Sequence, residues 1–147
     1  MATMSATDEP ALVRRLRATE ATEAQFTGKA WRLGRFDCWQ LAYAHLRRLG
    51  WSLPKLPRYR TEAEAQAAMA AFGVKNLLEA LDAIGLKRRP GAASALIGDI
   101  LFMPGNGPLG TLTIALGNGA MRGFHEDHVG LVAMRGPTII AAWDALP

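Results

Sequence analysis

The sequence changes its pattern near Pro90, and this change most constrains the fold. Before it, apolar residues recur at helical spacing, as in the segment 75–84. From Ile97 onward, short apolar runs are separated by Gly, Asn and Pro, which is typical of strands joined by turns. Helices followed by antiparallel strands predict an α+β fold. The runs that we expect to form strands are Asp99–Met103, Thr111–Leu116, Ala120–Phe124, His128–Met134 and Thr138–Trp143.

The chain has the size of a single domain, at 147 residues and 15.9 kDa. Hydrophobic residues make up 50% of it, so it can bury a core. We expect residues 1–9 to form a flexible arm and residues 10–147 to form one domain. Its helical half covers about 10–90 and its sheet half about 97–144. The sequence predicts no membrane span, and its single cysteine excludes an internal disulfide.

Capping residues predict where two helices of the first half begin, and an apolar face predicts a third. Asp37 is the N-cap candidate for a helix over 38–49. Thr61, followed three residues later by Glu64, has the pattern of a capping box at the start of an Ala-rich helix. Another helix, over 75–84, has a clear apolar face. We expect the last two helices to serve as packing elements.

One more helix is predicted at the start of the domain, where Pro10 follows an acidic residue. Leu12, Val13 and Leu16 fall on one side of it, and Arg15 and its neighbouring arginines fall largely on the other.

Positive charge is concentrated in the first half of the chain. Eleven Lys or Arg residues stand against three acidic ones between Arg14 and Arg60, a net of about +8, whereas the whole chain carries +4. This distribution fits either an interface for an anionic partner or a solvated arginine-rich surface. Because the charges are scattered and no nucleic-acid-binding motif accompanies them, we do not expect nucleic acid as a partner.

Cys38 stands in the first turn of the helix predicted over 38–49. A thiol at that place meets free main-chain N–H groups and the positive end of the helix dipole, and both stabilise a thiolate. Arg35 would favour the thiolate too, whereas Asp37 would oppose it. Two interpretations stay open: Cys38 is a nucleophile that needs a histidine, or it is a small buried apolar residue.

Three motifs resemble the NlpC-type cell-wall peptidases. The run Trp31–Trp39, WRLGRFDCW, resembles the family's nucleophile segment, in which an Asp-Cys pair begins the first core helix. Ile97–Phe102 resembles its Gly-Asp strand, and Leu116–Gly119 resembles the hairpin after its catalytic-histidine strand. The motifs keep the family's order from Phe26 to Trp143. The resemblance implies a papain-like fold, with N-terminal helices packed on a C-terminal antiparallel sheet.

Three short stretches resemble more narrowly a small phage-encoded branch of this superfamily. They are Gly34–Cys38, Tyr59–Glu62 and Ala142–Trp143. The members of the branch are encoded among tail genes and have no settled function. This resemblance implies a virion component at the tail tip or hub, made in the bacterial cytoplasm. It would contact other phage tail proteins in a multi-copy assembly, with peptidoglycan as a further candidate partner.

The resemblance also implies a degenerate catalytic site. When Leu116–Gly119 is aligned with the family hairpin, the catalytic histidine falls near Thr111, where Thr111 and Leu112 stand, and the third, orienting residue falls near Gly123. Threonine is no general base near neutral pH, and glycine has no side chain. A cysteine without its base retains little of the paired nucleophile's power, so this alignment predicts a retained scaffold without peptidase activity.

A second alignment would keep the enzyme active. The run His128–Val132 resembles by itself the family's histidine strand, and it would supply His128 as the base for Cys38. It requires Thr111–Phe124 to be an inserted hairpin. The chain would then be a cysteine peptidase or amidase that cleaves peptidoglycan stem peptides through a thioester. His125 could reach the same pocket from the preceding loop.

The other histidine arrangements point to no cofactor or metal. The run 125–128, with two histidines and two acidic residues, would hold a metal ion only if it were helical. Gly123 and the strand-like run that follows argue against a helix there, so we expect a turn without a metal. His45 lies two helical turns after Cys38, too far to touch its sulfur, and we expect a core or surface histidine.

Overall fold

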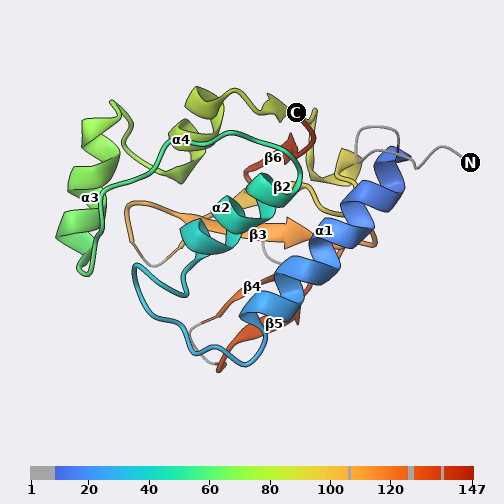
Figure 1. Ribbon diagram of the computed structural model, residues 1–147, viewed down its shortest axis with the longest axis horizontal. Helices are drawn as coiled ribbons and strands as arrows, with labels where there is room; N and C mark the ends of the chain where they lie inside the picture. Colours follow the sequence, from blue (N-terminus) through green and yellow to red (C-terminus); the bar gives the residue numbers. More distant parts are fainter. Residues whose placement is uncertain (1–8, 106, 126–127, 137) are drawn as a thin grey trace, which may run out of the picture.

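The computed structural model describes residues 9–105, 107–125, 128–136 and 138–147. Within these ranges it is an α+β protein, as predicted, with four α-helices and one six-stranded antiparallel sheet (Figure 1). The expected arm lies outside the described residues except for Glu9 and stays a prediction. The helices are α1 (Ala11–Phe26), α2 (Cys38–Arg48), α3 (Glu62–Ala71) and α4 (Leu77–Ile84), followed by a short 3-10 helix (Ala92–Ser94). None of the helices described here is long and apolar enough to cross a bilayer.

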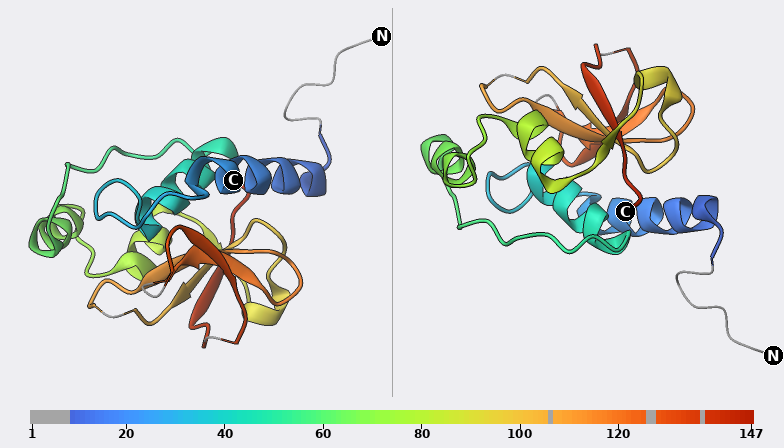
Figure 2. Two further views of the ribbon diagram at one scale, coloured as in Figure 1. Left: turned by 90° about the horizontal axis from the view of Figure 1, so that it is seen from below. Right: turned by 90° about the horizontal axis from the view of Figure 1, so that it is seen from above.

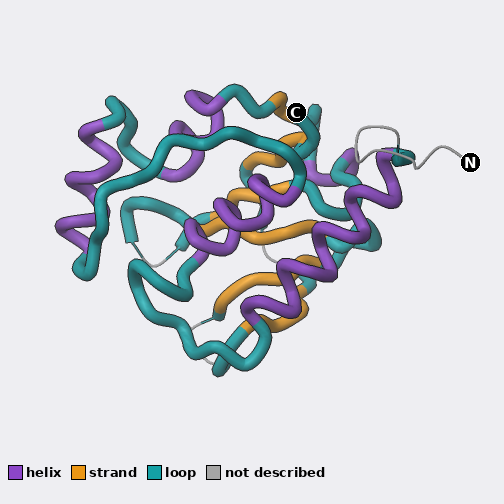
Figure 3. The backbone as a smooth tube through the Cα atoms, viewed as in Figure 1, coloured by secondary structure: helices purple, strands orange, loops and turns teal. Residues whose placement is uncertain are grey.

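The sheet has the strand order β1-β6-β2-β3-β4-β5, and every neighbouring pair is antiparallel. Helices α1 and α2 form a layer over one face of it, with α2 against β3 and β4 (Figure 2). Helix α3 stands at one end of the molecule, at the end of a long loop that leaves α2 (Figure 3). The strands are β1 (Lys87–Arg88), β2 (Ile100–Met103), β3 (Thr111–Ala115), β4 (Met121–Phe124), β5 (Leu131–Met134) and β6 (Ala141–Asp144).

The capping residues act as the sequence predicts. The Asp37 carboxylate accepts a hydrogen bond from the main-chain N–H of Gln40, which starts α2, and Thr61 accepts one from Glu64 at the start of α3. Two strands begin three residues later than predicted: β5 begins at Leu131, with His128 in a bend before it, and β6 begins at Ala141. The short strand β1 lies outside the predicted runs.

The two faces of the sheet bury different sets of side chains, because successive residues of a strand point to opposite sides. The cross-strand pair Phe102 and Leu112 belongs to the helix-facing side, where both pack into the main core. The pair Leu101 and Thr113 belongs to the far side, where Leu101 joins a second, smaller cluster. A residue's place on β2 or β3 therefore decides which side it faces.

The buried side of α1 is not the apolar side that its sequence suggests. Leu12, Val13 and Leu16 are 59%, 38% and 38% exposed, whereas Arg15 is only 3% exposed. Arg15 points to the protein because its guanidinium pairs with the buried carboxylate of Asp99 and the half-buried one of Asp144. Its Nη1 lies 2.5 Å from Asp99 Oδ1, and its Nη2 lies 2.5 Å from an oxygen of Asp144. A polar partner in the core thus reverses the expected orientation of the helix.

Asp99 is the centre of this buried network. It is fully buried just before β2, and its Oδ1 also accepts the main-chain N–H of Ala145 at 3.0 Å. Its other oxygen accepts Arg89 Nε and the N–H of Leu96, both at 2.9 Å. Buried carboxylates are tolerated when their lone pairs are satisfied in this way. The network joins α1, the start of β2 and the chain that follows β6.

We predict that Arg15→Gln lowers the free energy of unfolding by about 3 to 5 kcal/mol, because it leaves the Asp99 carboxylate with one fewer buried cation. Arg17→Gln is the matched control, since Arg17 lies on the same helix but is exposed and pairs with Glu9 at the surface. It should cost less than about 1 kcal/mol. Urea unfolding of both variants measures the difference, and similar losses would contradict the central role of Asp99.

Candidate functional site

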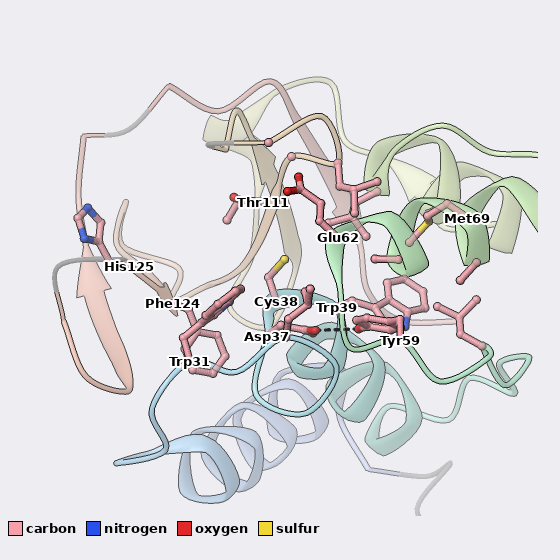
Figure 4. A pocket seen from close by; sticks show the side chains of 18 of the residues that line it. Trp31, Asp37, Cys38, Trp39, Tyr59, Glu62, Met69, Thr111, Phe124 and His125 are labelled. Carbon is pink, nitrogen blue, oxygen red and sulfur yellow. Dashed lines mark hydrogen bonds between the residues drawn. The ribbon is translucent and has the colours of Figure 1, made fainter.

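A cavity of about 660 Å³ opens beside the N-terminus of α2. Most of its wall is apolar or aromatic, and Cys38 lies inside it (Figure 4). The wall is built by the segment before α2, helix α3, the β2–β3 loop and the end of β4. These parts contribute, among others, Trp31 and Leu33, Ala65 and Met69, Gly107 and Leu109, and Phe124.

The Cys38 thiol is half-buried at the start of α2. Burial raises its pKa to about 12. A main-chain hydrogen bond from Leu112 lowers the pKa, the negative charge of Asp37 raises it, and the N–H groups at the helix start lower it. The helix start therefore acts in the direction that the sequence suggests, but the loss of solvation outweighs it. The sulfur is a neutral thiol near neutral pH.

Asp37 holds the start of α2 in place. Its Oδ2 accepts the N–H of Gly34 at 2.7 Å and the hydroxyl of Tyr59 at 2.8 Å. Gly34 has a positive φ of 87°, and a Cβ there would lie 2.0 Å from the carbonyl oxygen of Tyr59. The stretches 34–38 and 59–62, which share the phage-branch resemblance, thus contact each other at the wall of the cavity.

Thr111 and Gly123 are the positions that align with the family's base and orienting residue. Thr111 begins β3 at the edge of the cavity, and its pairing with Met103 places it on the far side of the sheet. A Cβ on Gly123 would lie 2.5 Å from Thr113 Cγ2 and 3.1 Å from Met134 Cε. A side chain at 123 therefore requires its neighbours to move. On the helix-facing side, the Leu112 main chain contacts the sulfur.

His125 and His128 line the same cavity as Cys38. Their ring centroids lie 5.5 Å apart, and the N–H of His128 donates to the carbonyl of His125 at 3.1 Å. Figure 4 shows His125 on the other side of the cavity from the Cys38 sulfur. Among the described residues, no hydrogen bond joins that sulfur to an imidazole nitrogen. The structure thus places these groups in one cavity without the contact of a nucleophile and its base.

The run considered for a metal ion is only partly described, because Glu126 and Asp127 lie outside the described residues. Among the residues that the structure describes, no group of three or more His, Cys, Asp or Glu side chains is placed to hold a metal ion.

His45 is a core histidine on α2. Its Nε2 donates to the carbonyl of Gly98 at 2.8 Å, and its Nδ1 accepts from the Thr22 hydroxyl at 3.0 Å. Burial lowers its pKa to about 4, so the ring is neutral and holds α2 against α1 and the chain before β2. It has no part in the cavity.

Two residues of the cavity wall stand in the sequence only as parts of motifs, without a predicted role at the site. Trp31 is 55% exposed at the cavity, and Glu62 points its carboxylate into it (Figure 4). One sequence feature points to Glu62 as a site residue: it belongs to the stretch 59–62, which also contains Tyr59 and resembles the phage-encoded branch. Nothing in the local sequence shows that the first turn of α3 faces Cys38.

Comparison with solved structures gives the class of this fold. The chain is similar to NlpC2 from Trichomonas vaginalis, with 14% identity and a TM-score of 0.56 over 92% of this chain and 49% of that one. It is similar to NlpC1 from the same organism, with 16% identity, a TM-score of 0.57 and coverage of 92% and 46%. It spans about half the length of these proteins. The fold is therefore NlpC-like, as the sequence motifs predict.

The chain belongs to the family described as a domain of unknown function, DUF6950, whose model matches residues 12–145. No curated protein sequence matches it. The matched residues include α1 from Leu12 onward, the residues that line the cavity and every strand of the sheet. The features described above therefore lie within the family domain.

We predict that native Cys38 reacts slowly with iodoacetamide. Because its pKa is raised, its rate constant at pH 7.5 should be at least about a hundredfold below that of the urea-unfolded chain. The rate should rise with pH without a midpoint below about pH 9. Mass spectrometry of the alkylated protein measures both. A midpoint below about pH 7, the signature of a cysteine paired with a histidine, would contradict the geometry.

The burial of His45 predicts a pH dependence of stability. Its pKa is about 4 in the folded chain and near 6.5 when unfolded, so the unfolded chain binds more protons between these values. The free energy of unfolding should therefore fall by about 3 kcal/mol from this residue as the pH drops from 7 to 4. Urea unfolding of His45→Gln against the wild type isolates this part. Parallel pH profiles would refute it.

Proposed function

We propose that this chain is a non-catalytic NlpC-like protein, in which the peptidase scaffold serves as a binding domain. The observation that carries this proposal is the environment of Cys38. Its thiol is neutral, and it accepts a main-chain hydrogen bond from Leu112. The positions aligned with the family's base and orienting residue hold Thr111 and Gly123. An NlpC-type reaction needs a thiol that an imidazole deprotonates, so the raised pKa of Cys38 and the residues at 111 and 123 support a chain without this step.

We further propose that the protein is a structural component of the tip or hub of a phage or phage-like tail. The support comes from the resemblance of 34–38, 59–62 and 142–143 to the phage-encoded branch. Two of these stretches contact each other in the fold, because the Tyr59 hydroxyl donates a hydrogen bond to Asp37. The resembling residues therefore belong to one part of the structure. Such a component is made in the bacterial cytoplasm, joins other tail proteins in several copies and ends in the virion.

An active cysteine peptidase is the second candidate. It is favoured by the presence of His125 and His128 in the same cavity as Cys38. In that reaction, an imidazole takes the thiol proton and the sulfur attacks a stem-peptide carbonyl. The C–N bond then breaks, the amine leaves with the proton, and water hydrolyses the thioester. The main-chain N–H of Cys38 would stabilise the oxyanion.

Incubation with purified peptidoglycan separates the two candidates. We expect the wild-type protein to release no more soluble stem peptide than Cys38→Ala, because no base activates the thiol. Liquid chromatography with mass spectrometry detects the released peptides. Release that depends on Cys38 and is lost in His128→Ala or His125→Ala would establish the peptidase and overturn the non-catalytic proposal.

A further inference from the structure

The cavity beside Cys38 is acidic, although the chain as a whole is basic. The chain contains 17 Lys and Arg residues, yet none of the described residues that line the cavity is a Lys or Arg. Two of its lining residues, Asp37 and Glu62, are carboxylates, and two others, His125 and His128, are histidines. Asp37 is buried and already binds three donors, from Gly34, Gln40 and Tyr59. A charged group in the cavity would therefore meet Glu62.

Glu62 has no hydrogen bond or ion pair with any other described residue. It is the first residue of α3, and its carboxylate points across the cavity (Figure 4). Its Oε1 lies against the β2–β3 loop, 2.5 Å from the place where a Cβ on Gly107 would stand. The helix does not require this position of the side chain, since the N-cap of α3 is the bond between Thr61 and the N–H of Glu64.

The rest of the wall suits the aliphatic stem of a cationic side chain. Trp31, Trp39, Tyr59 and Phe124 are aromatic, and Met69 adds a flexible apolar surface. Aromatic faces attract ammonium and guanidinium groups, and the stems of Lys and Arg pack on apolar walls while their charged heads meet polar groups. A cavity of about 660 Å³ has the size of an ordinary ligand site and admits such a side chain with its flanking residues.

We propose that the cavity binds a lysine or arginine side chain presented by a protein partner, with the stem along the aromatic wall and the cation at the Glu62 carboxylate. The charge of the cavity selects this occupant: an acidic segment would meet Glu62 and Asp37, and a purely apolar one would leave Glu62 desolvated without a partner. The inference rests on the proposed function, because it assigns the retained peptidase cavity to binding.

Three short peptides test the proposal: acetyl-Leu-Lys-Leu-amide, its norleucine counterpart, which has the stem without the charge, and its glutamate counterpart. Tryptophan fluorescence measures binding, because Trp31 and Trp39 line the cavity. We expect the lysine peptide to bind about fivefold to tenfold more tightly than the norleucine peptide and the glutamate peptide to bind most weakly.

The matched variants are Glu62→Gln and Glu64→Gln, which remove one carboxylate each from the first turn of α3. Only Glu62 lines the cavity. The preference for lysine over norleucine should disappear in Glu62→Gln and persist in Glu64→Gln, while circular dichroism shows the same helix content in both. Equal binding of the lysine and norleucine peptides, no saturable binding of the lysine peptide at millimolar concentrations, or an equal loss of preference in both variants would overturn the inference.

The outcome is separable from that of the peptidoglycan assay. Cys38-dependent release of stem peptides would overturn the non-catalytic proposal. It would not change the order of affinity in which the three short peptides bind. A lost ranking without any cleavage would overturn the cation site and leave the non-catalytic proposal standing.

Discussion

The position of the candidate site depends on the buried ion pair between Arg15 and Asp99. Asp99 directly precedes β2 and also binds the main chain after β6, so its carboxylate fixes the sheet and α1 to one another. Helix α1 in turn packs on α2, and His45 ties α2 to Gly98, the residue before Asp99. A charge pair that would be costly if it were unsatisfied thus sets where the N-terminus of α2, with Cys38, meets the sheet.

Asp37 shows why a motif of the peptidases need not carry their chemistry. Its carboxylate caps α2 and accepts the Tyr59 hydroxyl, and these bonds stabilise the fold whether or not Cys38 reacts. Burial and the charge of Asp37 both raise the pKa of Tyr59, so its hydroxyl stays a donor. The Asp-Cys pair therefore has a structural reason to be present, and its presence alone does not establish an active peptidase.

The accuracy of prediction from sequence follows the range of the interactions. The starts of α2 and α3 were predictable, because the bonds from Asp37 and Thr61 span only three residues. The burial of Arg15 was not, because its partner Asp99 lies 84 residues away. The protonation state of Cys38 was not predictable either, because it also depends on residues that are distant in sequence. The helix start lowers its pKa locally, but the burial that raises it comes from parts of the chain far away in sequence.

Solvation differs between the two ends of the cavity, and so does the chemistry that each end favours. Low solvation destabilises a thiolate, so the Cys38 sulfur keeps its proton and presents a small neutral surface. Glu62 is exposed to solvent, so its carboxylate stays charged at the open side of the cavity, and a ligand that displaces the surrounding water strengthens its attraction for a cation. Glu62 lacks a cationic partner among the described residues, and the aromatic wall beside it covers the stem of one. If the cavity binds as we propose, the apolar wall near Cys38 receives the stem of the ligand and Glu62 meets its charge at the open side.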